Sequence, residues 1–354
     1  MIKFHQKQIF IPSILKIGNG ELSNLGQYLK EESFMNVACF FSAGIEEIFG
    51  EKIFKSLDST EIKILHKDTI EEIHIENIIH TAFRIPKNVD ALVGIGGGKA
   101  LDYSKYCAFV LDLPFISIPT STSNDGFCSP NSSLLVENKR KSVKAKIPYG
   151  VIVDIEALQT SPESCIYSGI GDLISKVTAG FDWQEASRLG KDGFNDFSYL
   201  IANNTVADIV NYQNLDIKST EFLYHLANSL LMNGISMEIA GSSRPASGSE
   251  HLISHAYDEV TKKQSMHGIQ VGIATYICSY LQNNQFEVVK NFLETTGFFD
   301  YVSKYPLNKS EFIEAVKTAP TIKENFYTVL SDSGNIEKAI NFVNTDEIMI
   351  RICK

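Results

Sequence analysis

The sequence predicts an α/β domain built on a parallel sheet, followed by an all-helical domain. In the first 155 residues, short apolar runs rich in β-branched and aromatic residues alternate with helix-like segments, as in βαβ units. Beyond about Ile155, long helical patterns follow one another between Gly, Pro and Asn residues, and no segment alternates as a strand does. The 354 residues also exceed the roughly 250–300 at which a single core stops growing. We therefore expect two domains, residues 1–155 and 156–354, with the boundary near Asp154.

Five buried strands are expected in the first domain, where apolar runs are short and bounded by turn residues. They cover residues 37–41, 62–65, 91–95, 115–118 and 151–153. A helix is expected over residues 70–85, because apolar residues repeat there at helical spacing and form one stripe. The stripe consists of Ile75, Ile78, Ile79, Ala82 and Phe83. This helix would cover one face of the sheet.

The charge balance disfavours a nucleic-acid partner. The chain carries 42 acidic and 32 basic residues, a formal net charge of -10. The one basic block is Lys139-Arg140-Lys141, which is too short to offset repulsion from a polyanionic backbone. We therefore expect no nucleic-acid binding.

Cysteine usage and hydropathy indicate a cytoplasmic protein. The six cysteines include no CxxC pair and no even framework, a pattern typical of free thiols in a reducing compartment. The first residues lack a basic region followed by an unbroken apolar stretch, so we expect no signal peptide. No window reaches the roughly 18–20 apolar residues that a membrane span requires.

A glycine-rich segment, ALVGIGGGKALD at residues 91–102, runs from a buried strand into a helix that continues to about Leu111. Successive glycines let the backbone approach a pyrophosphate, and the free N–H groups at the helix start can donate to it. A purely structural turn is the alternative reading. The motif GxGxxG with an acidic residue some twenty positions later is absent, so this segment is not an ordinary Rossmann fingerprint.

A cluster of hydroxyl side chains follows the next strand, in PTSTSNDGFCSP at residues 119–130. Ligands of α/β sheets bind at the edge where the carboxyl ends of the parallel strands lie, and hydroxyl groups both donate and accept hydrogen bonds. Asp125 is the only acid in the segment. It either caps the turn that follows or contacts the hydroxyl groups of a substrate.

Three residues of the helical half have the chemistry of divalent-cation ligands: Asp172, His251 and His267. Two imidazoles and one carboxylate leave an open position on zinc or iron, as a catalytic site requires. However, 79 residues separate Asp172 from His251 and 16 separate His251 from His267, so the spacing is no local ligand signature. Scattered polar residues therefore remain the alternative.

Two histidines, His251 and His255, are four residues apart and project from one face of a helix. One could hold the metal and the other the substrate, or His255 could be an ordinary histidine of the helix surface. Glu250 lies on a different face of this helix from His251, so we do not include it among the ligands.

Five motifs together resemble the sn-glycerol-1-phosphate dehydrogenase family, within the wider group of iron-type alcohol dehydrogenases, glycerol dehydrogenases and dehydroquinate synthases. They are GGGK at 96–99, PTSTSNDG at 119–126, GDLIS at 171–175, SRPASGSEHLISHA at 243–256 and HGIQVG at 267–272. The resemblance covers about residues 10–285, and SRPASGSEH is its most specific part. It implies the two-domain fold of the dehydroquinate synthases, with an active site between a nucleotide-binding domain and a helical domain.

The resemblance also implies roles for individual residues. Asp172, His251 and His267 would hold zinc, and Asp125, Asp172 and His255 would contact the substrate and serve catalysis. The residues facing NAD(H) or NADP(H) would be Gly96, Gly97, Gly98, Lys99, Ala100, Leu101, Asp102, Thr120, Ser121, Thr122, Ser123 and Ser129. The substrate would be a small phosphorylated C3 compound, interconverted between dihydroxyacetone phosphate and sn-glycerol 1-phosphate. A homo-oligomer is left open.

This chain departs from the family pattern at two positions. Asn124 stands where the family commonly has His, and Ile269 stands where it commonly has Glu. After the strand at 37–41 comes Ser42-Ala43-Gly44, with neither the acid expected for NAD nor an Arg for NADP, so the choice of cofactor is open. Two histidines and one carboxylate suit Fe²⁺ and Ni²⁺ as well as Zn²⁺.

Three other functions remain as alternatives. A glycerol dehydrogenase or another polyol dehydrogenase would use the same cofactor and metal. A sugar-phosphate cyclase of the dehydroquinate synthase kind shares the fold, but its metal ligands are Glu, His and His, where this chain has Asp172 first. A non-catalytic nucleotide-binding protein is the third alternative, because a fold does not guarantee a function.

Overall fold

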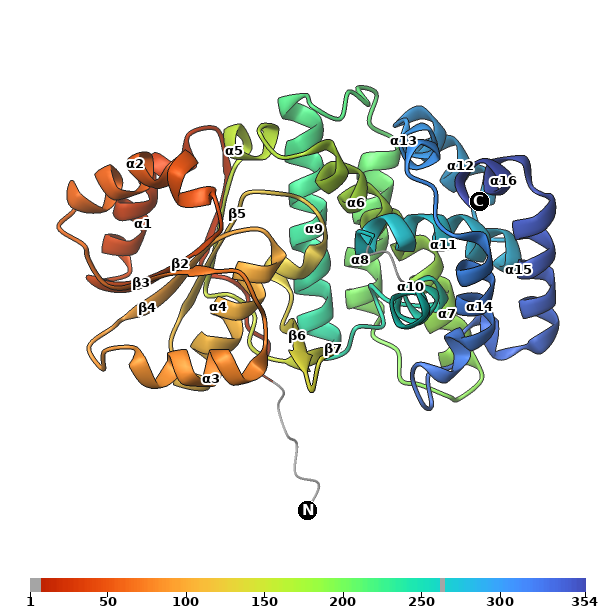
Figure 1. The fold of residues 1–354 in the computed structure, drawn as a ribbon, viewed down its shortest axis with the longest axis horizontal. Coiled ribbons are helices and arrows are strands. Elements are labelled where there is room, and N and C mark those ends of the chain that lie inside the picture. Colours follow the sequence, from red (N-terminus) through yellow and green to blue (C-terminus); the bar gives the residue numbers. More distant parts are fainter. Residues whose placement is uncertain (1–7, 262–264) are drawn as a thin grey trace, which may run out of the picture.

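A parallel sheet of six strands forms one end of the molecule (Figure 1). The computed structural model describes residues 8–261 and 265–354. The strand order is β1-β8-β5-β4-β2-β3, and every pairing in this sheet is parallel. The strands are β1 (Ile14–Gly18), β2 (Asn36–Ser42), β3 (Lys63–Ile70), β4 (Ala91–Gly96), β5 (Phe115–Pro119) and β8 (Gly150–Asp154). The five expected strands are thus confirmed.

Three strands were not expected from the sequence. Strand β1 lies at the sheet edge beside β8 and is only partly buried, so its apolar pattern is weak. Strands β6 (Asn131–Val136) and β7 (Lys139–Lys144) form a separate antiparallel hairpin. Because β7 reads KRKSVK and is mostly exposed, it carries no hydrophobic alternation.

Helices cover both faces of the sheet. On one face lie α1 (Leu25–Glu31) and α2 (Ile45–Asp58), and on the other α3 (Ile75–Arg84) and α4 (Gly98–Leu111). The expectation of a helix over residues 70–85 is wrong for residues 70–74, because Ile70 still belongs to β3. The apolar core on the α3 and α4 face continues without a break into the helical half.

The rest of the chain is helical, as expected. After β8 come α5 (Ile155–Gln159), α6 (Glu163–Ile174), α7 (Lys176–Arg188), α8 (Asp196–Val210), α9 (Thr220–Ala240), α10 (Ser249–Val260), α11 (His267–Gln282), α12 (Phe286–Thr295), α13 (Phe298–Lys304), α14 (Lys309–Thr318), α15 (Ser333–Thr345) and α16 (Glu347–Ile352). Short 3-10 turns also occur: η1 (Glu21–Asn24), η2 (Asp125–Cys128), η3 (Ala319–Thr321) and η4 (Val329–Ser331). In the described part of the chain, no helix has the length and apolar character to cross a membrane.

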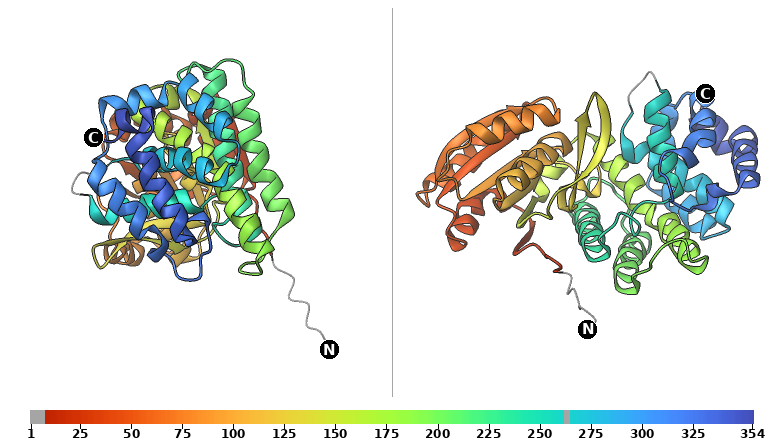
Figure 2. Two further views of the ribbon diagram at one scale, coloured as in Figure 1. Left: turned by 90° about the vertical axis from the view of Figure 1, so that its right-hand side faces the viewer. Right: turned by 90° about the horizontal axis from the view of Figure 1, so that it is seen from below.

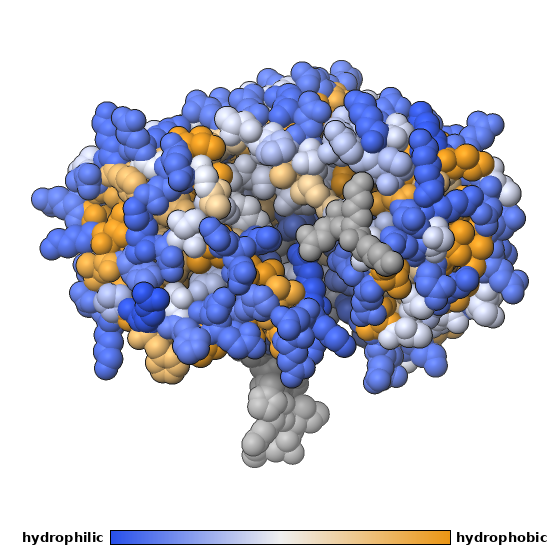
Figure 3. Space-filling view, viewed as in Figure 1, coloured by the Kyte–Doolittle hydropathy of each residue, from blue (hydrophilic) through white to orange (hydrophobic). Residues whose placement is uncertain are grey.

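The two halves meet beside the carboxyl ends of the strands (Figures 1 and 2). The hairpin β6–β7 lies at this junction beside α9 (Figure 1), and η2 packs against α9. In the space-filling view the surface is hollowed between the halves, and hydrophilic residues lie along the hollow (Figure 3). All six cysteines are free, and all but Cys165 are buried.

Candidate active site

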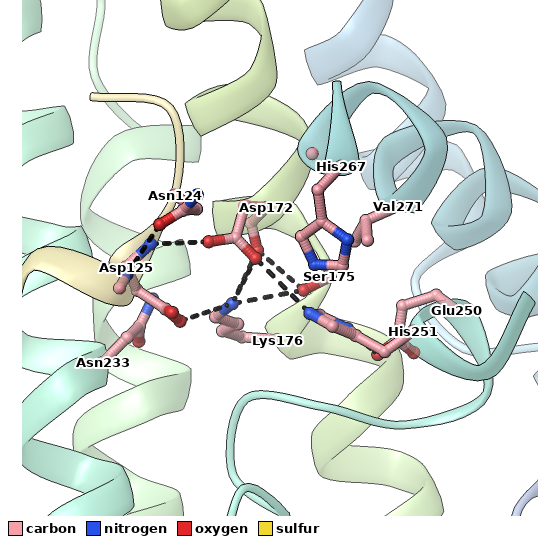
Figure 4. A network of polar contacts seen from close by, with 12 residues as sticks. Asn124, Asp125, Asp172, Ser175, Lys176, Asn233, Glu250, His251, His267 and Val271 are labelled. Carbon is pink, nitrogen blue, oxygen red and sulfur yellow. Dashed lines mark hydrogen bonds and ion pairs between the residues drawn. The ribbon is translucent and has the colours of Figure 1, made fainter. Parts of the chain in front are cut away.

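Three side chains from three helices converge at the junction. Asp172 lies in the last turn of α6, His251 in the first turn of α10, and His267 begins α11. One ligand atom from each residue lies within 4.8 Å of the other two. His251 Nε2 is 3.5 Å from Asp172 Oδ1, and the three side chains face one another in Figure 4. Two imidazole nitrogens and a carboxylate oxygen around one point form a donor set that fits a divalent transition metal.

Glycines allow the helices that carry these residues to approach closely. A Cβ on Gly171 would lie 2.0 Å from the carbonyl oxygen of Gly268, and a Cβ on Gly268 would lie 1.9 Å from that of Ser168. Both contacts are backbone contacts between α6 and α11, so no side chain can move aside to relieve them. Each glycine is the sequence neighbour of a candidate ligand, Asp172 or His267. The glycines of GDLIS and HGIQVG therefore place Asp172 beside His267.

The orientation of His251 is set by its neighbour Glu250. Glu250 Oε1 lies 2.8 Å from His251 Nδ1, and Thr178 Oγ1 donates to Glu250 Oε2 at 2.7 Å. A carboxylate at Nδ1 keeps the proton on that nitrogen and leaves Nε2 to face Asp172. Glu250 is fully buried behind the ring, so it is not among the converging ligand atoms. Its contact with His251 was not expected from the sequence.

His267 is oriented through a chain of hydrogen bonds. Ser254 Oγ donates to Gln270 Oε1 at 2.6 Å, and lies 2.9 Å from His267 Nδ1. Gln270 Nε2 donates to Asp258 Oδ1 at 2.8 Å, which fixes the direction of the amide. Because the Ser254 proton is used toward Gln270, His267 Nδ1 must donate to Ser254 Oγ. Nε2 of His267 is therefore free to bind a cation.

Replacing Glu250 by Gln should weaken metal binding while the fold is kept. The amide oxygen can still accept from His251 Nδ1, but the negative charge that raises the basicity of the imidazole is lost. We expect the affinity for Zn²⁺ to fall by about 10- to 100-fold, as is usual for such outer partners of metal ligands. Zinc titration against a competing chelator measures the effect. Glu259→Gln, an exposed position on the same helix, is the matched control and should bind zinc as the wild type does.

A buried lysine, Lys176, joins the metal cluster to the loop after β5. Its Nζ lies 3.1 Å from Asp172 Oδ1 and 3.0 Å from Asp125 Oδ2 (Figure 4). The backbone N–H of Asp125 also donates to Asp172 Oδ2 at 2.8 Å. Burial opposes ionisation, but the cations Lys176 and His251 hold the pKa of Asp172 well below its usual range. Lys176 was not expected; its position four residues after Asp172 is the signal that could have identified it.

The position of Asp125 contradicts one of the two readings of this acid. The cap of η2 is Asn124, whose Oδ1 accepts from the N–H of Gly126 at 2.8 Å. The carboxylate of Asp125 instead pairs with Lys176, on the side of the metal cluster. Burial and the nearby Asp172 raise the pKa of Asp125. The reading of Asp125 as a local cap is therefore wrong.

His255 lies one helical turn beyond His251 on α10. Its ring centroid is 5.6 Å from that of His267, so it borders the metal cluster without joining it. Burial and then the charges of His251, Lys323 and Arg140 lower the pKa of His255 to about 3. The imidazole is neutral at neutral pH and can both donate and accept a hydrogen bond.

The glycine-rich segment at residues 91–102, called the glycine turn from here on, leads into the start of α4. Gly96 has φ +141, and a Cβ there would lie 2.2 Å from Ser42 Oγ, so only glycine fits. The N–H of Gly97 donates to Ser42 Oγ at 3.0 Å. No side chain caps α4, so its first N–H groups remain available to an anion. The segment at residues 119–130 with its cluster of hydroxyls, called the hydroxyl loop from here on, faces this turn. Ser121 Oγ would lie 3.8 Å from a Cβ added at Gly97, and Asn124 Nδ2 would lie 3.9 Å from one added at Gly98.

The other expected cofactor residues lie around this turn in different environments. Lys99 is exposed, whereas the side chains of Ala100 and Leu101 pack into the core and leave only their backbone for contacts. Asp102 Oδ1 is 3.4 Å from the buried Lys105 Nζ. Of the hydroxyl residues, Ser121 and Ser123 are partly exposed, and Thr120, Thr122 and Ser129 are buried. Thr122 Oγ1 is buried and has no hydrogen-bond partner among the described residues, as expected of a group that awaits a ligand.

The two departures from the family pattern have structural roles of their own. Asn124 serves as the cap of η2 described above. Ile269 is buried in the apolar core of the helical half. Neither residue belongs to the cluster of Asp172, His251 and His267.

Comparison with known proteins decides the family. The sequence profile of the iron-containing alcohol dehydrogenases matches residues 16–162. Glycerol-1-phosphate dehydrogenase [NAD(P)+] from Metallosphaera sedula is 33% identical over 338 residues, which cover 94% of this chain and 95% of that protein. The chain belongs to the glycerol-1-phosphate dehydrogenase family. The same enzyme from Thermococcus sibiricus is 33% identical over 308 residues, which cover 86% of this chain and 87% of that protein.

Solved structures share the fold with this member of the glycerol-1-phosphate dehydrogenase family. A probable glycerol dehydrogenase from Sinorhizobium meliloti matches with a TM-score of 0.74 and 17% identity, covering 98% of this chain and 99% of that chain. A sulfoacetaldehyde reductase from Bifidobacterium kashiwanohense, solved with NAD+, has a TM-score of 0.75 and 14% identity, covering 97% and 100%. The expectations of this family, of a dehydrogenase and of the two-part fold are confirmed. The expected nicotinamide cofactor agrees with the names of these relatives.

Proposed function

We propose that this chain interconverts dihydroxyacetone phosphate and sn-glycerol 1-phosphate by hydride transfer with NAD(H) or NADP(H), with a divalent metal ion in the site. The observation that carries the proposal is the convergence of the buried Asp172 and His251 with the half-buried His267, beside a glycine turn whose helix has no side-chain cap, in a chain of this family. The ligand nitrogens and the carboxylate suit Zn²⁺, Fe²⁺ and Ni²⁺. The free cysteines support a cytoplasmic location.

The protein groups around the metal position have separate roles in substrate binding and proton transfer. The metal, when bound, supplies Lewis-acid polarisation of the substrate carbonyl. Lys176 pairs with both Asp172 and Asp125, and it holds Asp125 toward the site, where Asp125 binds a substrate hydroxyl. His255 lies one helical turn from His251, with its ring 5.6 Å from that of His267, and from this position it relays a proton between the substrate oxygen and water.

The glycine turn holds the dinucleotide. The N–H groups of Gly98, Lys99 and Ala100 at the start of α4 donate to the pyrophosphate. Ser42, at the end of β2, is already used by the N–H of Gly97, so it fixes the turn and adds no charge at the ribose. With neither an acid nor an Arg in Ser42–Gly44, both NADH and NADPH serve as cofactors.

A substrate panel tests this function. On mixing the zinc-loaded enzyme with NADH and dihydroxyacetone phosphate, absorbance at 340 nm should fall, and in the reverse direction sn-glycerol 1-phosphate should be oxidised in preference to sn-glycerol 3-phosphate and glycerol. We expect kcat/KM for dihydroxyacetone phosphate to exceed that for dihydroxyacetone by at least about 100-fold, the effect of two charge-assisted hydrogen bonds to phosphate. Equal activity on both ketones would contradict the phosphorylated substrate.

The buried Lys176 favours a second candidate function, because sugar-phosphate cyclases use lysines in the active-site cleft. A cyclase regenerates its NAD within each turnover, so it gives no net change at 340 nm. Conversion of a sugar phosphate without net oxidation of NADH would support the cyclase and exclude the dehydrogenase.

A further inference from the structure

A second buried lysine, Lys105 of α4, holds the segment that carries Asp125. Its Nζ donates to the carbonyl oxygen of Gly126 at 2.6 Å and to that of Asn131 at 2.7 Å. Gly126 directly follows Asp125, and Asn131 begins β6, so the two contacts fix the chain between η2 and the hairpin. Helix α4 packs against both η2 and β6. Lys105 therefore joins the helix that follows the glycine turn to the loop that carries Asp125.

All three N–H groups of the Lys105 ammonium have partners within the protein. Besides the two carbonyl oxygens, Nζ donates to Asp102 Oδ1 at 3.4 Å, on the same helix. The side chain of Lys105 is 0% exposed, whereas that of Asp102 is 14% exposed. The two carbonyl contacts are at the short end of the range for hydrogen bonds from a charged donor. Lys105 is thus a fully satisfied cation, and it can act on a ligand only through the residues that it holds.

Stability alone does not account for a charge at this position. Taking an ammonium group out of water is unfavourable, and replacing a buried ion pair by apolar side chains of similar volume is often neutral or stabilising. An apolar side chain, however, cannot donate to the carbonyl oxygens of Gly126 and Asn131. The ammonium of Lys105 therefore determines where this loop lies relative to α4.

Asp125 is held from both halves of the molecule. Its backbone N–H donates to Asp172 Oδ2 at 2.8 Å, and its Oδ2 lies 3.0 Å from Lys176 Nζ (Figure 4). Both of these partners belong to the helical half, whereas Lys105 holds the next residue from the half that contains the sheet. Lys105 thus relates the position of Asp125 to the glycine turn at the start of its own helix.

We propose that Lys105 is a positioning residue, which places the carboxylate of Asp125 for the substrate hydroxyl at a fixed distance from the cofactor on the glycine turn. This inference rests on the proposed function, in which Asp125 binds the substrate and the glycine turn binds the dinucleotide. Hydride transfer needs the substrate carbon and the nicotinamide in contact, and a displacement of about 1 Å can lower the rate by about 100-fold. Lys105 itself touches neither molecule, because its three N–H groups are already bound to the protein.

The first test compares Lys105→Met with the wild type on dihydroxyacetone phosphate and NADH. We expect kcat/KM for dihydroxyacetone phosphate to fall by about 10- to 100-fold, while the dissociation constant of NADH, measured by its fluorescence, changes by less than about twofold. Lys105→Arg keeps the charge and the N–H donors, so it should recover part of the loss. The matched control is Ser104→Ala. Ser104 is also buried on α4, but its hydroxyl donates to the carbonyl oxygen of Ala100 within the same helix, so both quantities should stay at wild-type values.

A double-mutant cycle with Asp125→Asn separates positioning from a general loss of packing. If Lys105 acts through Asp125, Lys105→Met should lower kcat/KM by less than about threefold in the Asp125→Asn background, because the effects of coupled residues are not additive. A readout without turnover is the binding of dihydroxyacetone phosphate in isothermal titration calorimetry. It should weaken in each single variant and hardly further in the double variant. If Lys105→Met does not fold, Lys105→Gln, which keeps two N–H donors, takes its place in every comparison.

Three results would overturn the role of Lys105 and leave the proposed function intact, provided that the wild type is active on dihydroxyacetone phosphate. The first is unchanged kinetics in the Lys105 variant. The second is a double variant whose loss equals the product of the two single losses. The third is a loss of NADH affinity as large as the loss of kcat/KM, because Lys105 would then hold the glycine turn alone. A wild type inactive on dihydroxyacetone phosphate would contradict the proposed function and with it this inference.

Discussion

Replacing His267 by Ala is expected to abolish metal binding and turnover together. His267 is one of only two imidazoles in the cluster, and its Nε2 is free toward Asp172 and His251. Loss of one of three protein ligands leaves a two-ligand site, and Lewis-acid catalysis worth several kcal/mol is lost with the ion. We expect kcat/KM to fall by about 10³-fold or more. Metal content by atomic absorption and NADH oxidation at 340 nm measure the two effects on the same sample.

The control for this variant is His80→Ala, an exposed histidine on α3 far from the cluster. It should keep both the metal content and the activity of the wild type. Full activity in a metal-free His267→Ala protein would exclude the scheme in which Asp172, His251 and His267 hold a catalytic ion. Circular dichroism that matches the wild type would show that the loss does not come from unfolding.

Replacing Gly171 by Ala is expected to damage stability and the metal site at once. The new Cβ would lie 2.0 Å from the carbonyl oxygen of Gly268, so α6 and α11 must move apart. Overpacking of this kind costs about 3 kcal/mol, which lowers Tm by roughly 5 °C in a protein of this size. Because Asp172 is the next residue, its carboxylate also moves away from His267. Thermal unfolding and zinc titration measure the two consequences.

Gly193→Ala is the matched control for this substitution. A Cβ on Gly193 would have no heavy atom within 4 Å, and the residue does not need a positive φ. Its Tm should therefore stay equal to or slightly above that of the wild type. A Gly171→Ala protein with wild-type Tm and zinc affinity would show that the helix crossing at Gly171 does not determine the site.

The strands and helices that could be predicted are those whose burial leaves a pattern of apolar residues within the segment itself. Strands β2 and β4 are buried on both faces, so each appears as an unbroken apolar run between turns. Strand β7 is exposed and charged, and β1 is a half-buried edge strand, so neither has such a pattern. The start of α3 was placed too early, at residue 70, although the apolar stripe begins only at Ile75 and the backbone of Ile70 belongs to β3.

The residues of the candidate site also fall into two groups, those predicted from the sequence and those found only in the structure. The glycine turn comes directly after strand β4, and the hydroxyl loop comes directly after strand β5. Because these two strands are parallel, both segments lie at the same edge of the sheet. Lys176 and Ser254 were not assigned roles, because each contacts a residue from another turn or another helix. Glu250 was excluded as a ligand on helical geometry, and only the structure shows its contact with Nδ1 of the adjacent His251.

The sequence by itself therefore determined the two-part architecture, the cofactor edge of the sheet and, through family motifs, which residues to examine for metal binding. Periodicity and turn residues record how each segment is buried, and this information is local. Only the tertiary structure placed Asp172, His251 and His267 within 4.8 Å, since they are 79 and 16 residues apart and lie on three helices. The crossing of α6 and α11 at Gly171 and Gly268 brings Asp172 beside His267, and packing between helices is not encoded in the spacing of the ligands.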